Sequence, residues 1–173
     1  MPNTELKIPK ERIPILIGKQ GKIKQKIEEE TSTKLQIDSE EGDVIISGED
    51  GLKVLLAKKI IQAIARGFNP KIAFNLLEEN TYLELVNITE YSKKSQKALF
   101  RIRSRAIGTE GRARKNIEKM TNCNISIYGK TVAIIGKSED INIAKKAMEQ
   151  LILGSPHSNV YYFIERQKQR SNQ

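Results

Sequence analysis

The chain has few of the residues from which metal centres and disulfides are built. Its 173 residues include one cysteine, Cys123, one histidine, His157, and no tryptophan. A lone cysteine forms no internal disulfide, and with a lone histidine it is too little for a zinc site of the usual kind. The metal ions of nucleases require clustered carboxylates, whereas the consecutive residues Glu28–Glu30 would point in different directions around a helix axis. The sequence therefore predicts no metal, no cofactor and no enzyme activity.

Long hydrophobic runs are also missing. No apolar stretch reaches the roughly 18 residues that a membrane span requires, and the N-terminus carries no apolar signal region. Hydrophobic residues still make up 38% of the chain, which is enough for small buried cores. We therefore expect a cytoplasmic protein without a membrane partner.

Charge of one sign is in excess. Lysine and arginine number 30 against 21 aspartates and glutamates, a net charge of +9. Residues 1–69 contribute 12 basic and 11 acidic side chains, whereas residues 70–173 contribute 18 and 10. A basic surface of this kind indicates an anionic partner, and nucleic acid is the first candidate.

One short motif occurs twice. The segment Ile17–Gly21 (IGKQG) returns ninety positions later as Ile107–Gly111 (IGTEG). The same offset holds beyond the motif and then falls to 88 and 87, as small changes in loop length would produce. The matched pairs at the first offset are Ile27 with Ile117, Thr31 with Thr121, Leu35 with Ile125 and Ile37 with Ile127. Two copies of about seventy residues indicate tandem domains.

Hydrophobic periodicity predicts the same order of elements in both halves: strand, helix, glycine turn, helix, strand, strand, helix. In the first half we expect strands at 5–8, 34–38 and 44–47 and helices at 12–17, 22–30 and 52–66. In the second we expect strands at 82–88, 124–128 and 132–135 and helices at 93–107, 112–120 and 139–153. The segment 160–164 is predicted as a strand or a packed helix, before a frayed end. The fold class is α+β.

The glycine turns are the candidate binding sites. Glycine presents no side chain, so a phosphodiester chain can approach the backbone, and the following helix points its N–H groups at the same place. The candidates in the first half are Gly18, Lys19, Gln20, Gly21, Lys22 and Lys24. Those in the second half are Gly108, Thr109, Glu110, Gly111, Arg112 and Arg114.

A basic stripe leads into the second turn. Lys93, Lys97, Arg101 and Arg105 are spaced by four, so a helix would align them. Residues 93–119 hold ten basic side chains and two acidic ones. The carboxylate of Glu110 repels phosphate, but one negative charge does not cancel the positive charge around it. We therefore add Arg101 and Arg105 to the candidate site.

The wall opposite a glycine turn must hold the bases. Aromatic residues are only 5% of the chain and none lies at a turn, so the sequence favours recognition by base edges and shape over ring stacking. Apolar residues around each turn are candidates for this wall or for the core, and core is favoured for most of them. They are Ile23, Ile27, Leu35 and Ile37, and Ala113, Ile117, Ile125 and Ile127.

These motifs resemble the type I KH domain, in which three helices back a three-stranded sheet in the order βααββα. The resemblance implies that each Gly-x-x-Gly turn clamps about four nucleotides of single-stranded RNA or DNA. It also implies a first KH domain at 1–69, a linker helix at 70–80, a second KH domain at 81–154 and a C-terminal tail at 155–173. Most KH domains have isoleucine three residues after the second glycine, where this chain has Lys24 and Arg114.

That departure, together with the linker motif at 65–70 (ARGFNP) and the tail motif at 153–161 (LGSPHSNVY), resembles the archaeal branch of the Partner of Nob-one, or Dim-two, family of ribosome-assembly factors. The resemblance implies binding of the 3′ region of the small-subunit rRNA precursor. It further implies cooperation with the processing endonuclease and contacts with assembly or translation-initiation factors.

Two other functions stay open at this point. The domains could serve a general single-strand binder in RNA decay or transcription. Alternatively, the chain could be a protein-interaction scaffold with vestigial glycine turns. A nuclease is disfavoured because the acid–base residues that it needs are missing.

Overall fold

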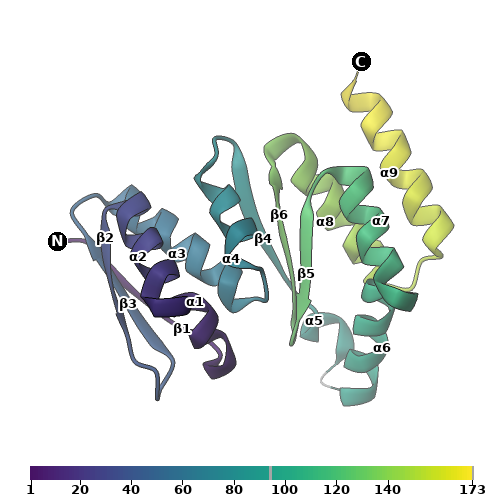
Figure 1. Cartoon of the computed structure of the whole chain (residues 1–173). Coiled ribbons are helices and arrows are strands. Elements are labelled where there is room, and N and C mark those ends of the chain that lie inside the picture. Colours follow the sequence, from purple (N-terminus) through teal and green to yellow (C-terminus); the bar gives the residue numbers. More distant parts are fainter. Residues whose placement is uncertain (94, 173) are drawn as a thin grey trace. The chain divides into compact units, whose positions relative to one another are not determined.

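The computed structural model describes residues 1–93 and 95–172, which form two compact units, Met1–Glu79 and Asn80–Gln173. Residue 94, inside the predicted helix 93–107, and residue 173, at the end of the predicted tail, lie outside the described residues. Each unit contains one three-stranded antiparallel sheet with its helices on one face (Figure 1). The predicted α+β class is confirmed.

The first unit has the strand order β1-β3-β2, so β3, the last of the three along the chain, is the central strand of the sheet. Its strands are β1 (Asn3–Lys7), β2 (Thr33–Ile37) and β3 (Asp43–Gly48). Its main helices are α1 (Ile13–Ile17), α2 (Lys22–Thr31) and α3 (Gly51–Ala65). Short 3₁₀ turns precede α1 and α2, at Lys10–Arg12 (η1) and Lys19–Gly21 (η2).

Helix α3 is defined by signals at both ends. The Asp50 side chain caps it by accepting the Leu52 N–H at 3.0 Å. At the other end Gly67 has φ +102°, and the Phe68 N–H bonds back to the Ala63 carbonyl at 3.1 Å. This is the Schellman geometry, with Gly67 as the left-handed residue just after the helix.

The segment expected to be a linker helix is part of the first unit. It forms α4 (Pro70–Ala73), capped by the Asn69 side chain, and a 3₁₀ turn, η3 (Phe74–Leu77). Phe74 and Leu76 are buried in these turns, which pack on α3. The boundary between the compact units therefore lies after Glu79, where this apolar face ends.

The second unit repeats the topology, with strand order β4-β6-β5. Its strands are β4 (Thr81–Asn87), β5 (Asn124–Tyr128) and β6 (Thr131–Lys137). Its helices are α5 (Thr89–Ser92), α6 (Gln96–Ile107), α7 (Arg112–Thr121), α8 (Ser138–Ile152) and α9 (His157–Ser171), with a 3₁₀ turn η4 at Thr109–Gly111.

The predicted start of the long helix at Lys93 is wrong. Lys93 has a left-handed backbone, φ 50°, and α6 begins only at Gln96. The Ser95 hydroxyl accepts the Ala98 N–H at 3.2 Å and caps the helix there. A serine cap in extended geometry thus overrides the apparent four-residue periodicity upstream of it.

The C-terminal tail is a packed helix. Val160 and Ile164 on α9 have no exposed surface and join the core cluster of the second unit. The Asn116 side chain of α7 also donates to the Tyr161 hydroxyl at 3.2 Å. The packed-helix alternative predicted for 160–164 is therefore confirmed, and the end that was expected to fray continues as helix to Ser171.

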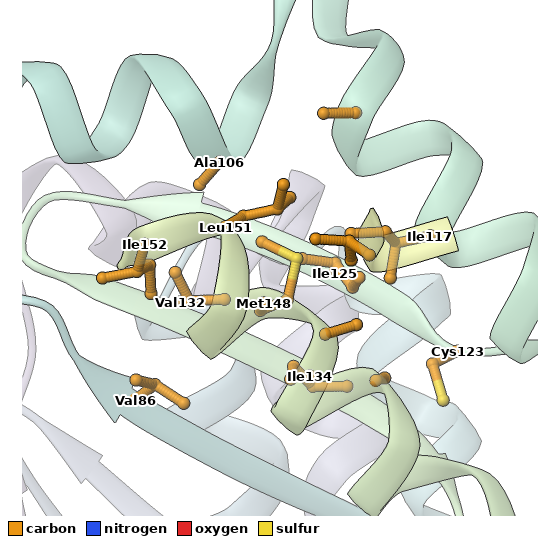
Figure 2. Packing of buried hydrophobic residues seen from close by; sticks show 14 of the residues in the cluster. Val86, Ala106, Ile117, Cys123, Ile125, Val132, Ile134, Met148, Leu151 and Ile152 are labelled. Carbon is orange, nitrogen blue, oxygen red and sulfur yellow. The ribbon is translucent and has the colours of Figure 1, made fainter. Parts of the chain in front are cut away.

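Helix α8 and strand β6 form the centre of that core. Figure 2 shows Met148, Leu151 and Ile152 of α8 gathered over Val132 and Ile134 of the sheet. The helix is apolar along its inner face, as its predicted periodicity requires. None of the helices over the described part of the chain is long and apolar enough to cross a membrane.

If α9 is integral to the second unit, Ile164→Ala should lower the free energy of unfolding by about 2–4 kcal/mol, the usual cost of deleting buried methylenes. Tyr162→Ala is the control on the same helix, because Tyr162 is 61% exposed. Urea unfolding measures both changes. Equal stability of the two variants would show that α9 does not belong to the core.

The buried thiol of Cys123 should make the stability of the second unit depend on pH. Burial raises the pKa of its thiol to about 11, so the thiol ionises at lower pH in the unfolded chain than in the folded one. Between pH 9 and 11 the stability of the wild type should therefore fall relative to Cys123→Ala, by on the order of 1–3 kcal/mol. Urea unfolding at each pH measures the difference, and parallel pH profiles would contradict the expectation.

Candidate nucleic-acid interface

The two glycine turns have the same backbone. The first glycines, Gly18 and Gly108, have φ/ψ of 76°/174° and 78°/172°. Two residues on, Gln20 and Glu110 have 56°/28° and 56°/26°, in the left-handed region. The repeat in the sequence is thus a repeat in three dimensions, including its strained positions.

The first glycine of each turn is required by packing. A Cβ on Gly18 would lie 2.4 Å from Ile23 Cγ1 and 2.9 Å from the Ile23 nitrogen. A Cβ on Gly108 would lie 2.7 Å from both Cβ and N of Ala113. Only a residue without a side chain lets the next helix begin this close to the turn.

The second glycine has a different role. Gly21 and Gly111 also have positive φ, 72° and 73°. A Cβ on Gly21 would meet nothing within 4 Å, and one on Gly111 would meet only Lys115 Cε at 3.7 Å. The second glycine therefore leaves bare peptide facing open space, where another molecule can approach.

The side chains around the turns are exposed, and they sit at the N-termini of α2 and α7. The exposed candidates at this point are Lys19, Gln20, Lys22, Thr109, Glu110 and Arg112. Arg112 Nη2 lies 3.1 Å from Glu110 Oε2, so the acidic residue in the second turn has a cation beside it. Both side chains are more than 70% exposed, and a pair of this kind contributes little stability.

The basic stripe on α6 is shorter than expected. Lys97 and Arg101 are exposed on the helix, but Lys93 precedes it. Arg105 Nη1 donates to the Ile152 carbonyl at 3.5 Å, so it also stabilises the C-terminal end of α8. The structure therefore leaves three of the four predicted cations, Lys97, Arg101 and Arg105, exposed on the helix.

Phe100 is a surface feature that the sequence analysis missed. It is 71% exposed on α6, next to Arg101. The apolar pair Leu99 and Phe100 was its only signal, because consecutive residues lie about 100° apart on a helix and do not share one buried face.

Lys24 and Arg114 each form an ion pair on their own helix. Lys24 Nζ lies 4.0 Å from Glu28 Oε1, and Arg114 Nη1 lies 2.6 Å from Glu118 Oε1. The two glutamates were not among the predicted site residues. Their signal was the spacing of four residues from a cation on the same helix.

A groove runs beside the first turn. Its volume is about 890 Å³, and its walls include Ile17, Lys24, Leu35 and Ile37. One side of the groove is the end of α1 and the start of α2. The rest of the lining comes from β2, the turn after it and the neighbouring strands β1 and β3, and it includes the carboxylates of Glu5, Asp38, Glu40 and Asp43. Its size and mixed lining suit a small organic group such as a nucleobase.

The apolar residues around the turns divide between core and groove. Five of them are buried, as predicted for core positions: Ile27, Leu35, Ala113, Ile117 and Ile125. Three are only partly buried and lie beside the turns or on the edge strands: Ile23, Ile37 and Ile127. Within residues 1–93 and 95–172 no three His, Cys, Asp or Glu residues come together as a metal site.

Known proteins share this arrangement. A model of the eukaryotic type (type I) KH domain, specific for the second KH domain of PNO1, matches residues 82–169, and a general KH domain model matches residues 3–63. The chain belongs to the KH family. It has two KH domains, each with its Gly-x-x-Gly turn between two helices.

Relatives narrow the family to a tandem KH protein of the Dim2/PNO1 type. A KH domain-containing protein of Methanocaldococcus jannaschii is 45% identical over 95% of this chain and 74% of its own length. A pre-rRNA-processing protein PNO1 of Coccidioides immitis is 30% identical over 58% of this chain. The match spans 40% of that PNO1 protein, so less than half of its length is represented.

Solved structures agree with the sequence relatives. Dim2p from Pyrococcus horikoshii has 49% identity and a TM-score of 0.89, over 96% of this chain and 99% of that one. A chain of the a/eIF2α–aDim2p–rRNA complex from the same organism has 49% identity and a TM-score of 0.90, over 98% and 95%. The Dim2-like tandem KH architecture is therefore confirmed.

The unequal roles of the two glycines in this KH protein can be tested by stability. Gly18→Ala should lower the free energy of unfolding by about 2–4 kcal/mol, because the added Cβ overlaps Ile23 and the backbone is strained. Gly21→Ala should lower it by only about 1–2 kcal/mol, the cost of a left-handed alanine. Urea unfolding of the full chain compares them, and a larger loss for Gly21→Ala would contradict the assigned roles.

Proposed function

We propose that this protein is a non-enzymatic RNA-binding factor of small-subunit assembly. It binds a single strand from the 3′ region of the small-subunit rRNA precursor through its Gly-x-x-Gly turns. The observation that carries the proposal is the pair of open second glycines, Gly21 and Gly111, each placed at the start of a ten-residue helix beside exposed cations.

The turn supplies affinity for the sugar-phosphate chain. Bare peptide at the second glycine lets a phosphate approach, and the N-terminus of the following helix favours negative charge. Lys19 and Lys22 add positive charge at the first turn, and Arg112 does so at the second. Lys97 and Arg101 extend this charge along α6.

The groove beside the first turn receives bases, and the matching backbone of the second turn supports an equivalent base site there. A strand whose phosphates rest on Gly18–Gly21 would direct its bases toward the groove lined by Ile17, Leu35 and Ile37. Single-stranded RNA fits such a site because its bases are free to turn toward the protein. A duplex keeps its bases paired and stacked, so it lacks the groups that this groove would hold.

The assignment to ribosome assembly is supported by the relatives. The 49% identical chain belongs to a complex that contains rRNA and an initiation-factor subunit, and a PNO1 relative is a pre-rRNA-processing protein. We propose the same classes of partner here, namely rRNA, an initiation factor and the processing endonuclease, in the cytoplasm. A general single-strand binder and a scaffold with vestigial turns are the competing outcomes of the test.

Aspartate pairs in the turns test the proposal directly. Lys19→Asp with Gln20→Asp, and separately Thr109→Asp with Glu110→Asp, should each weaken RNA binding at least about tenfold by adding negative charge at the phosphate site. Aspartate tolerates the left-handed backbone of Gln20 and Glu110, so the fold is preserved. Fluorescence anisotropy with a labelled 3′-region RNA measures the affinity. Repeating the measurement at several salt concentrations gives the slope of log affinity against log salt concentration, which should become shallower by about 0.7 for each phosphate contact that is lost.

Lys59→Asp is the matched control, since Lys59 is exposed on α3, away from the turn. Undiminished RNA affinity in both aspartate-pair variants would favour the scaffold. Equal affinity of the wild type for a shuffled RNA of the same length would favour a general single-strand binder.

A further inference from the structure

An Arg–Glu pair covers the outer edge of the second sheet. Glu118 Oε2 accepts the Ile125 N–H at 2.8 Å, while Arg114 Nη1 donates to Glu118 Oε1 at 2.6 Å and to the Ile125 carbonyl at 3.4 Å. β5 is an edge strand, so these backbone groups of Ile125 face away from β6. The two side chains therefore form hydrogen bonds with the N–H and the carbonyl of Ile125, which would otherwise be open to a ligand at this edge.

The first unit has the same carboxylate with a different cation. Glu28 Oε2 accepts the Leu35 N–H at 3.0 Å, which is the counterpart of the Glu118 contact. The cation is Lys24, whose Nζ lies 4.0 Å from Glu28 Oε1. The carboxylate anchor is thus duplicated, whereas the group that it holds is an ammonium in one unit and a guanidinium in the other.

The position of this cation places it in the base-binding groove. Lys24 lines the groove of the first unit together with Ile17 and Leu35. Arg114 is the counterpart of Lys24 in the second unit: it lies three residues after Gly111 in a turn of the same backbone geometry, and its partner Glu118 bonds to β5 as Glu28 does to β2. When the turn holds an RNA strand, a base that enters the groove meets this cation beside the edge β-strand.

The guanidinium of Arg114 is fixed and only partly used. Its Nη1 bonds to Glu118 and Ile125, and the side chain is 29% exposed. The described residues provide no partner for its Nε and Nη2 donors, which form the side of a planar fork. A fork of this kind bonds best to two neighbouring acceptors, whereas a lysine ammonium is a single point of charge.

Only two of the four bases present two neighbouring acceptors on one edge. Guanine has O6 and N7, and cytosine has O2 and N3, whereas acceptors and donors alternate along adenine and uracil. We propose that Arg114, held in place by Glu118, is a specificity-determining residue that selects guanine or cytosine in the second KH groove. Lys24 gives the first groove no such selectivity. This inference rests on the proposed function, since it assumes single-stranded RNA at the turns.

The test uses the full chain and oligouridine of about eight nucleotides, twice the four that one KH groove takes. One central uridine is replaced by guanosine, cytidine, adenosine or 7-deazaguanosine, and affinities are measured by fluorescence anisotropy. The wild type should prefer guanosine or cytidine over adenosine and uridine by about tenfold. Loss of preference with 7-deazaguanosine alone would identify the N7 edge of guanine as the group that is read.

Arg114→Lys keeps the charge but removes the fork. It should reduce the preference below about threefold while affinity for plain oligouridine stays within about twofold. Glu118→Gln should have the same effect, because glutamine still accepts the Ile125 N–H but no longer anchors Arg114 as an ion pair. Lys24→Arg is the reciprocal variant and should give the first groove a preference that wild-type Lys24 lacks, which strengthens the overall discrimination.

Retention of the full preference in Arg114→Lys, or the absence of any preference in the wild type, would overturn the inference. In either case, if the aspartate pairs in the turns weaken binding to oligouridine at least about tenfold, the proposed RNA-binding function stands. If the wild type binds none of these RNAs, the proposed function itself fails. Thermal melting of Arg114→Lys and Glu118→Gln separates a change in selectivity from a loss of folding.

Discussion

The contact between the first glycine of each turn and the helix behind it is the constraint on which the candidate site depends. At Gly18 and Gly108 any side chain would overlap the next helix, at 2.4 Å from Ile23 and 2.7 Å from Ala113. Because the helix starts so close to the turn, the second glycine and the helix N-terminus open on the same side. Bare peptide and a positive helix end, the two features that favour a phosphate, are thereby placed together.

A second contact holds the other side of the groove. The carboxylates of Glu28 and Glu118 bind the backbone N–H of Leu35 and Ile125, so each helix after a glycine turn is tied to an edge strand. The helix thus has a close glycine contact at one end and a carboxylate anchor on the strand. The spacing between helix and edge strand is consequently set by the same two contacts in both units, while the cation on the helix differs between them.

Much of the fold follows from local patterns in the chain. Apolar periodicity and the ninety-residue repeat predicted the α+β class and the order of elements, because each helix and strand buries one face. The start of α6 was mispredicted, since spacing of basic residues does not reveal that Ser95 caps the helix and that Lys93 is left-handed. Phe100 escaped notice for a related reason: which of two adjacent apolar residues is buried depends on the neighbouring elements.

The sequence by itself determined the duplication, the glycine turns, the excess of positive charge and the resemblance to tandem KH proteins, because these depend on residue identity and spacing. Only the tertiary structure decided that Lys24 lines a groove with residues of β2, that Arg114 bonds to the edge strand β5 and that Arg105 donates to the end of α8. It also showed that α9 completes the second core. These contacts involve residues from different helices and strands, and they form only when the helices pack on the sheet.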